Sequence, residues 1–292
     1  MINSDWQTEK EELGRKVIEL AYRSGCIETI FNTKNPDKRK NGWIFKDGSN
    51  SIYFINFRKI GKSPELTYIL SYAMRRVIEE EIKPDYDNSI LIGVDMAGIP
   101  LVSAISESAY IESGYKIKWG YTRPLPGEKI RTPDEADERL KKLKHDLISL
   151  GKWGEHNLIE GELFDGCDVI ITDDVANNLG SKLIARKIIE YEAEKLNVDV
   201  NCDKVLVGAN RQQGADEAAE KENMKLFYVV PMRTKGISYL EDLIPEDQFY
   251  YLELFVKDPS LFQDIDRDRE KDKNKGKNSP LMEDALRLAA SL

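Results

Sequence analysis

Short, continuous apolar runs alternate with helical segments between residues 90 and 230, and this alternation constrains the fold more than any other feature. Such runs are typical of strands covered on both faces. The strand candidates are residues 90–94, 116–121, 169–171, 205–207 and 226–230. The helix candidates between them are residues 99–110, 181–196 and 215–223. Because such alternation implies right-handed crossovers, we predict an α/β fold with a central, mostly parallel sheet flanked by helices. Ligands of such sheets bind at the carboxyl ends of the strands.

The chain before this region, residues 1–62, is predicted to form a small N-terminal hood. Residues 9–24 have the apolar spacing of a helix. Residues 42–57 have the pattern of two aromatic-rich extended segments around an Asp-Gly turn, which predicts a hairpin. The core domain is expected to span residues 63–245 and to begin with a helix at 64–81.

A long interruption at about 122–156 separates two strands of the predicted core. Thr132, Pro133 and Glu135 supply an N-cap, a proline at the first helical position and the glutamate of a capping box. Leucines follow at helical spacing, and Gly151 is suited to end the helix. We therefore expect a helical excursion inside a mobile loop, and we favour a solvated surface helix over a direct catalytic role.

The last part of the chain, residues 246–292, is predicted to be a C-terminal extension. From about residue 263 to residue 279 it consists mainly of Asp, Glu, Lys, Arg and Asn. Such a segment buries too little apolar surface to offset the entropy lost on ordering, so we expect it to be largely disordered. The pattern of residues 280–292 is compatible with a short amphipathic helix.

Composition and charge exclude several classes of function. The 292 residues carry a formal net charge of −9, whereas a general nucleic-acid binder needs a basic surface to displace counterions. No apolar run reaches the roughly 18 residues that cross a bilayer. The first residues also lack the basic and apolar regions of a signal peptide, so we expect a cytoplasmic protein without a membrane partner. Three widely spaced cysteines and only two histidines argue against a disulfide framework or a zinc site.

Two adjacent carboxylates at the end of an apolar strand are the strongest chemical signal. Within residues 169–181 the strand leads to Asp173 and Asp174, then to a small polar turn and the start of a helix. The N–H groups of the turn and the helix dipole suit a phosphate. The carboxylates suit vicinal ribose hydroxyls or a divalent metal ion held by the ligand. The motif favours a phosphosugar, although an ordinary turn with an aspartate N-cap would have the same pattern.

Other polar positions also have two interpretations. The loop at 93–98 could hold a diphosphate on its N–H groups or be a tight strand-to-helix turn. Arg211 follows a strand, where it could pair with a planar carboxylate or form a surface salt bridge. Lys46 could neutralise a phosphate or be a solvated lysine of the hairpin. Tyr53 and Phe54 alternate across a strand, so one of them is expected to pack in the core.

Several segments resemble, in the same order along the chain, motifs of the orotate phosphoribosyltransferases. Residues 45–54 are similar to that family's early Phe-x-x-x-Gly and Ser-Pro-x-Tyr hairpin, and residues 93–101 to its diphosphate loop. Residues 157–161 resemble the segment that leaves its mobile catalytic loop. Residues 169–181 resemble its phosphoribosyl-diphosphate motif, and residues 210–215 its Asp-Arg-x-Glu-Gly segment. The resemblance extends roughly from residue 13 to residue 230.

This resemblance implies the type I phosphoribosyltransferase fold and a Mg²⁺-dependent enzyme. The implied reaction moves 5-phosphoribose from phosphoribosyl diphosphate to a pyrimidine base, with orotate giving orotidine 5'-monophosphate. A homodimer is implied too, because the family's mobile loop reaches the neighbouring subunit's site. The residues implied in catalysis are Lys152, Arg123, His156, Asp173 and Asp174, of which the two aspartates also hold the metal indirectly through the bound donor. The residues implied in substrate binding are Lys46, Tyr53, Phe54, Asp95, Met96, Ala97, Gly98, Asn177, Asn178, Leu179, Gly180, Ser181 and Arg211.

The interruption would supply the cations that close over the leaving diphosphate. Negative charge builds on that group as it departs, and cations that also exclude water would stabilise it. The family's loop uses an arginine, lysines and a histidine, which the resemblance carries onto Arg123, Lys152 and His156, with Lys129 as a further candidate. A structural role is the alternative for His156, which would be only partly protonated near pH 7.

Some residues depart from the family's pattern. Asn177, Asn178 and Leu179 stand where the family has threonines and a glycine, and the Cβ of Leu179 is expected to crowd the phosphate or to oppose a positive φ. Asn210 and Gln213 replace the acids on either side of Arg211, and the interruption is longer than the family's loop. Two alternatives therefore stay open: a ligand-binding regulator without turnover, or a transferase for a different nucleobase.

Overall fold

The computed structural model describes residues 4–45, 49–153, 157–263 and 278–292. The chain forms two compact units. The core unit comprises residues 1–14 and 64–231, and the hood unit comprises residues 15–63 and 232–292. The hood unit thus unites the N-terminal hood residues with C-terminal residues that the sequence assigns partly to the core domain and partly to a separate extension.

Within the described residues, the core unit is built on a six-stranded sheet in the order β10-β9-β8-β5-β6-β7. Its strands are β5 (Ser89–Gly93), β6 (Lys118–Thr122), β7 (Ile159–Glu160), β8 (Cys167–Ala176), β9 (Val200–Asn210) and β10 (Lys225–Pro231). Neighbouring strands pair in parallel, except that β7 pairs with β6 in the antiparallel direction. The predicted α/β class with a mostly parallel sheet is confirmed, and β8 and β9 are longer than predicted.

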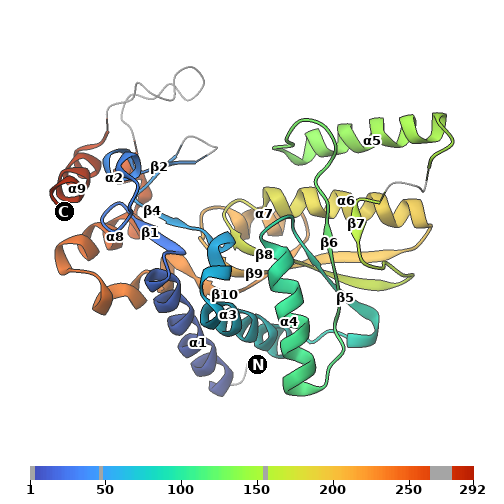
Figure 1. Cartoon of the computed structure of the whole chain (residues 1–292), viewed down its shortest axis with the longest axis horizontal. Coiled ribbons are helices and arrows are strands. Elements are labelled where there is room, and N and C mark those ends of the chain that lie inside the picture. Colours follow the sequence, from blue (N-terminus) through green and yellow to red (C-terminus); the bar gives the residue numbers. More distant parts are fainter. Residues whose placement is uncertain (1–3, 46–48, 154–156, 264–277) are drawn as a thin grey trace. The chain divides into compact units, whose positions relative to one another are not determined.

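Helices cover both faces of this sheet (Figure 1). The helices of the core unit are the first part of α1 (Ser4–Arg23), α3 (Pro64–Val77), α4 (Gly98–Ser113), α5 (Pro133–Ser149), α6 (Gly180–Leu196) and α7 (Ala215–Lys221). On one side α3 and α4 pack against each other, and on the other α6 packs on the sheet. Ile90 and Ile92 of β5 belong to the same hydrophobic cluster as Ile188 of α6, which follows from the two-residue alternation of side chains along a strand.

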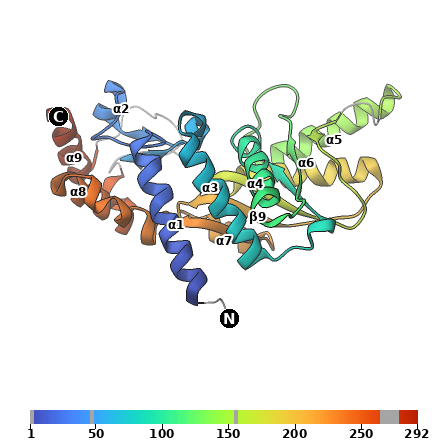
Figure 2. The ribbon, with the colours of Figure 1, turned by 60° about the horizontal axis from the view of Figure 1, so that its bottom comes forward.

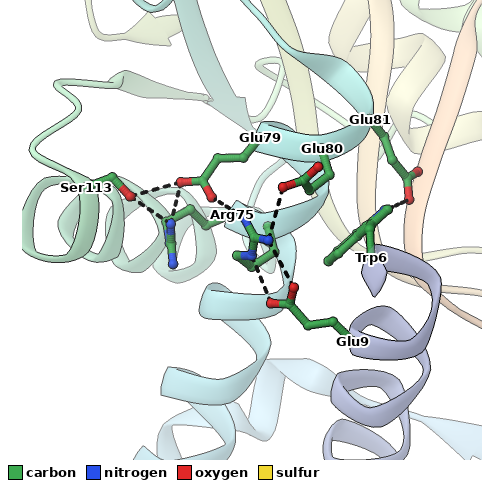
Figure 3. Close-up of polar contacts among 8 residues, drawn as sticks. Trp6, Glu9, Arg75, Glu79, Glu80, Glu81 and Ser113 are labelled. Carbon is green, nitrogen blue, oxygen red and sulfur yellow. Dashed lines mark hydrogen bonds and ion pairs between the residues drawn. The ribbon is translucent and has the colours of Figure 1, made fainter. Parts of the chain in front are cut away.

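An ion-pair network joins the first turns of α1 to the end of α3 (Figure 3). Arg76 donates to the two carboxylate oxygens of Glu9 at 2.9 Å each. It also donates to Glu79 at 2.7 Å and to Glu80 at 3.0 Å, and its guanidinium lies over the ring of Trp6. The hydrogen bond from Arg76 is the main reason that the pKa of Glu9 is lowered from its ordinary value. Arg76 is therefore the centre of the α1–α3 contact.

The hood unit consists of two short antiparallel sheets and helices from both ends of the chain (Figure 2). Its strands are β1 (Ile27–Thr29), β2 (Trp43–Ile44), β3 (Asn50–Ser51) and β4 (Tyr53–Ile55). Its α-helices are the second part of α1, α2 (Pro36–Asn41), α8 (Glu246–Lys257) and α9 (Pro280–Ser291). β2 pairs with β3, so the predicted hairpin is confirmed there, but β4 leaves the hairpin and pairs with β1.

The C-terminal segment packs inside the hood unit. α9 confirms the helix expected at 280–292 and packs against α2. The side-chain amide of Gln263 bonds both backbone groups of Asn50, accepting from its N–H at 2.7 Å and donating to its carbonyl at 3.2 Å. Most of the segment predicted to be disordered, residues 264–277, lies outside the described residues. In the described part of the chain, no helix combines the length and the apolar character needed to cross a bilayer.

Replacing Arg76 with methionine should destabilise the protein by about 1–3 kcal/mol at neutral pH, because Glu9, Glu79 and Glu80 each lose the hydrogen bonds that Arg76 donates to them. Glu9 contributes stability while it is ionised, and this contribution is lost as the pH falls below its ordinary pKa of 4.5. The difference between wild type and R76M should therefore narrow at about pH 3.5. Denaturant unfolding at both pH values measures the difference in the free energy of unfolding between wild type and R76M. R131M removes an exposed arginine and is the control. An equal R76M effect at both pH values would contradict the prediction.

Candidate functional site

Both predicted carboxylates lie at the carboxyl end of β8. β8 pairs with β9 from Cys167, opposite Val200, as far as Ala176, opposite Asn210, so the aspartates lie inside the paired strand rather than after it. Asp173 is 5% exposed, whereas Asp174 is half-buried. The difference is expected, because adjacent residues of a strand point to opposite faces. The two carboxylates therefore have different environments.

The carboxylate of Asp173 is bonded on both oxygens. Oδ1 accepts the N–H of Asp174 at 2.9 Å. Oδ2 lies 2.6 Å from Nζ of Lys182, and Ser181 Oγ lies at the limit of hydrogen bonding, 3.5 Å away. The Asp173 and Lys182 side chains are 8% and 4% exposed, so this is a buried ion pair. Asp173 thus organises the turn, while the half-buried Asp174 is the carboxylate better placed for a ligand.

The turn between β8 and α6 contains a leucine in the left-handed region. Leu179 has φ +61° and ψ −7°, and α6 begins at the next residue. The turn therefore adopts the positive φ that the Cβ of Leu179 was expected to oppose. A left-handed residue with a Cβ costs roughly 1–2 kcal/mol. The side chain is 1% exposed and belongs to the cluster that includes Ile188, and such burial contributes about 1.5–3 kcal/mol. Burial of the leucine side chain offsets the cost of its backbone conformation.

The two asparagines of this turn differ in their roles. The side chain of Asn178 caps the turn, because its Oδ1 accepts the N–H of Gly180 at 3.3 Å. Oδ1 of Asn177 is buried and has no hydrogen-bond partner among the described residues. A buried polar atom without a partner is costly, and a bound ligand is one way to satisfy it. Asn177 is therefore the turn residue that most clearly lacks a partner in the described structure.

The predicted diphosphate loop lies beside the carboxylates. Val94 donates its N–H to the carbonyl of Thr172 at 2.9 Å, one residue before Asp173. A Cβ on Gly98 would collide with that same carbonyl, so glycine is required there by space. The N–H of Asp95 bonds Oγ1 of Thr122 at 3.2 Å, which ties the loop to the end of β6. Asp95, Met96, Ala97 and Gly98 are therefore held next to the ends of β6 and β8, and Met96 is 69% exposed.

Arg211 lies next to the same turn. Its N–H donates to the carbonyl of Ala176 at 2.9 Å. Its side chain is buried, and Nε donates to Oε1 of Gln213 at 2.9 Å. Nδ2 of Asn210 donates to both carboxylate oxygens of Asp216, at 3.0 and 2.9 Å. Asn210 and Gln213, which replace the family's acids, are thus bonded within the β9–α7 segment.

The structure separates the predicted loop cations. Arg123 follows β6 and its Nη1 lies 3.4 Å from Glu160 Oε1 at the surface. Lys152 is exposed and precedes Trp153, whose ring packs on Tyr191 with centroids 5.3 Å apart. Tyr191 is eleven residues beyond Gly180 on α6, or about 17 Å along the helix axis. Lys152 therefore lies far from the phosphate turn. Lys46 and His156 are outside the described residues.

The interruption contributes a surface helix, as expected, and this helix packs one face on α6 while most of its residues stay exposed or half-buried. α5 lies along α6 (Figure 1), with Ala136 and Leu140 buried in the shared cluster. The N-cap of α5 is as predicted, because Thr132 Oγ1 accepts the N–H of Glu135 at 3.2 Å. Burial, together with nearby glutamates, raises the pKa of Tyr191 to about 12. Among the leucines of the interruption, Leu140 is buried, Leu143 packs partly buried against the same cluster, and Leu150 is 68% exposed.

The segment that leaves the interruption is also held by α6. Glu192 accepts the N–H of Leu158 at 2.7 Å and forms a buried ion pair with Lys195. Lys195 Nζ in turn donates to Oδ1 of Asn157 at 3.1 Å. One helix therefore carries the phosphate turn at its start and the exit of the interruption near its end.

The two predicted aromatic residues of the hood differ in burial. Tyr53 is 1% exposed and packs edge-on against Phe255 with ring centroids 5.7 Å apart. Phe54 is half-buried and stacks on Trp43 with centroids 6.0 Å apart. The prediction that one of the pair packs in the core is confirmed, and Tyr53 is that residue. Phe54 is thus the more accessible of the two side chains.

Sequence reasoning missed Lys182, which is the residue closest to Asp173 among the cations described above. The buried face of α6 comprises Lys182, Ala185, Ile188, Ile189, Tyr191, Glu192 and Ala193. The available signal was two charged residues, Lys182 and Glu192, on this otherwise largely apolar stripe. Charged side chains on a buried face are rare unless they are paired.

Sequence comparison relates the chain to curated orotate phosphoribosyltransferases, whereas no family model matches it. The chain is 28% identical over 218 residues to the orotate phosphoribosyltransferase of Methanocaldococcus jannaschii, and the alignment covers 75% of this chain and 94% of the relative. It is 27% identical over 222 residues to that of Pyrococcus abyssi, covering 76% of this chain and 92% of the relative. The resemblance predicted from the motifs is confirmed.

Comparison with solved structures confirms the type I phosphoribosyltransferase fold. Orotate phosphoribosyltransferase from Francisella tularensis aligns with a TM-score of 0.53 and 17% identity, over 83% of this chain and 98% of that chain. Leishmania donovani UMP synthase aligns with a TM-score of 0.54 and 18% identity, over 83% of this chain. The protein spans only 42% of that longer chain.

At position 179, glycine should destabilise the protein less than alanine. Both variants lose the buried leucine side chain, which costs about 2–5 kcal/mol for alanine. Glycine avoids the left-handed penalty, so L179G should be more stable than L179A by about 1 kcal/mol. Leu140 in the middle of α5 is the matched control, because glycine should be the worse replacement there by about 0.5–1 kcal/mol. Chemical denaturation of the four variants measures both differences, and the same order at both positions would refute this account of Leu179.

Proposed function

We propose that this protein is an orotate phosphoribosyltransferase, which converts orotate and phosphoribosyl diphosphate to orotidine 5'-monophosphate and diphosphate. The observation that carries the proposal is the pair Asp173 and Asp174 at the end of β8, followed directly by the turn and α6. Curated relatives of that name align over about three quarters of the chain and more than nine tenths of their own length. Neither a regulator without turnover nor a different base is favoured by these relatives.

The donor would be held by three neighbouring segments of the core unit. Asp174 accepts hydrogen bonds from the ribose hydroxyls, because it is the more accessible of the two carboxylates. The turn from Asn177 to Ser181 and the N-terminus of α6 hold the 5-phosphate. The loop from Asp95 to Gly98 holds the diphosphate, since it is tied to both β6 and β8. This arrangement fixes the ribose of the donor between the 5-phosphate and the diphosphate.

The reaction exchanges one bond at ribose C1. The bond from C1 to the diphosphate oxygen breaks, and its electron pair leaves with the diphosphate, while N1 of orotate forms the new bond to C1 and gives up its proton to solvent. Arg211 would pair with the orotate carboxylate. Arg123 is the exposed cation at the end of β6 and would stabilise the leaving group. Lys152 would reach it only after Trp153 leaves Tyr191.

Magnesium fits this site as part of the bound donor. Among the described residues there is no cluster of three or more His, Cys, Asp or Glu side chains that could hold a metal ion. Asp173 is engaged on both oxygens, so the described residues supply no metal cage of their own. Mg²⁺ would neutralise charge on the diphosphate as it leaves. Asp173 and Asp174 would then act on the ion only through the ribose hydroxyls of the donor.

The other roles implied by the resemblance are part of the same proposal. Lys46 and Phe54 of the hood would approach the ligand, and His156 would act with the loop cations. We also propose that the protein is a cytoplasmic homodimer with small-molecule substrates and without a nucleic-acid partner. Its net charge of −9 supports the last point.

Purified protein should release diphosphate when given orotate, phosphoribosyl diphosphate and Mg²⁺. D174N should lower kcat/KM by about 10²-fold, because a carboxylate that meets the ribose in the transition state is lost. D168N is the matched control: Asp168 lies near the start of the same strand, where it pairs with Lys204 at 2.7 Å. A coupled diphosphate assay measures all three proteins.

The same assay separates the alternatives. Turnover with another nucleobase but not with orotate would reassign the base. Calorimetric binding of the donor without turnover on any base of a panel would identify a regulator. If the donor neither binds nor reacts, the proposed function is refuted.

A further inference from the structure

Lys182 is a buried cation beside the turn from Asn177 to Ser181, which the proposed function assigns to the donor and which is called the donor turn below. No role has been given to Lys182 above. It lies in the first turn of α6 on the inward face and is 3% exposed. Its ammonium lies 2.6 Å from Oδ2 of Asp173 and 3.3 Å from Oγ of Ser181, and it donates to the carbonyl of Val175. These contacts join the end of β8 to the start of α6 from the inside of the turn.

The contacts use the whole hydrogen-bonding capacity of the lysine. An ammonium has three donors and no acceptor, and three oxygens surround this one. A lysine in that position has no donor left for a phosphate. Its charge nevertheless reduces the net negative charge at this point from −2, for the two aspartates alone, to −1 with the lysine, and this weakens the repulsion of an anionic donor.

The turn needs these stabilising contacts because it is not built from small residues. Leu179 is left-handed with a buried side chain, and Oδ1 of Asn177 has no partner among the described residues. Both features oppose the shape of the turn unless surrounding structure holds it. Lys182 spans the turn on either side of them, from Val175 to Ser181.

We infer that Lys182 is a positioning residue for phosphoribosyl diphosphate. It fixes the carboxylate of Asp173 and the two ends of the turn in the shape that binds the donor, and it does not touch the donor itself. This inference rests on the proposed function, because it concerns the same site. A positioning role differs from a purely stabilising role in one respect: the lysine affects donor binding through its contact with Asp173.

A double-mutant cycle tests this inference, with calorimetric titration of phosphoribosyl diphosphate and Mg²⁺ into the full-length protein. K182M replaces the lysine with an apolar side chain of similar length, and D173N removes its partner's charge. Each single variant should bind the donor about 10–100-fold more weakly than wild type. K182M/D173N should bind within about threefold of the weaker single variant, because two residues that act together do not contribute independently.

Thermal unfolding separates positioning from stability. Removing both charges together should restore much of the melting temperature that K182M loses, because no buried charge is then left without a partner. Donor affinity should stay low in this well-folded double variant, which shows that the loss of donor binding in the cycle is not a loss of folding. K187M is the control: Lys187 lies on the same helix, and its side chain is 36% exposed. In turnover, the KM for the donor should rise while the KM for orotate stays within about twofold of wild type.

Three outcomes would overturn the inference. Wild-type affinity in K182M would show that the lysine has no role in binding. Effects of K182M and D173N that multiply would show that the lysine contacts the donor directly. Recovery of donor affinity together with melting temperature in the double variant would reduce its role to stability. If wild type itself binds no donor, the proposed function fails first, and the inference fails with it.

Discussion

The backbone contact between Gly98 and the carbonyl of Thr172 is the constraint on which the rest of the site depends. It lets the start of α4 lie directly against β8, and the bond from Val94 to the same carbonyl keeps the loop there. A side chain on Gly98 would force the loop away from the strand that carries the acids. Because Asp95 is also bonded to Thr122, three strand ends converge on one place. A ligand with charges at both ends needs such convergence more than it needs any single side chain.

The parts of this site that sequence reasoning could predict are those set by local backbone rules. A short apolar run, two carboxylates and a following helix can be recognised without tertiary structure, because each is a property of neighbouring residues. The role of Lys182 could not be recognised in this way. Its partner lies nine residues earlier and is reached only because the turn folds back across the strand end. The docking of α5 was missed for the same reason, since Trp153 meets Tyr191 across 38 residues of chain.

Three of the departures from the family's pattern are compensated locally. Leu179 takes the conformation expected of glycine and offsets its cost by burying its side chain. Asn210 bonds both oxygens of Asp216, and Gln213 accepts from Arg211. Asn177 differs from these three, because its buried Oδ1 has no partner among the described residues. Motif degeneracy in this chain is therefore weak evidence for loss of the binding site.

α6 links the two halves of the chemistry. Its first turn closes the donor turn through Lys182, and its last turns hold the exit of the interruption through Tyr191, Glu192 and Lys195. Releasing Trp153 from Tyr191 would cost only about 0.5–1.5 kcal/mol beyond the apolar area exposed. The buried residues of α5 would stay in place, because they belong to the hydrophobic cluster of the core. The bonds from Leu158 to Glu192 and from Lys195 to Asn157 would also have to break before the exit segment moves.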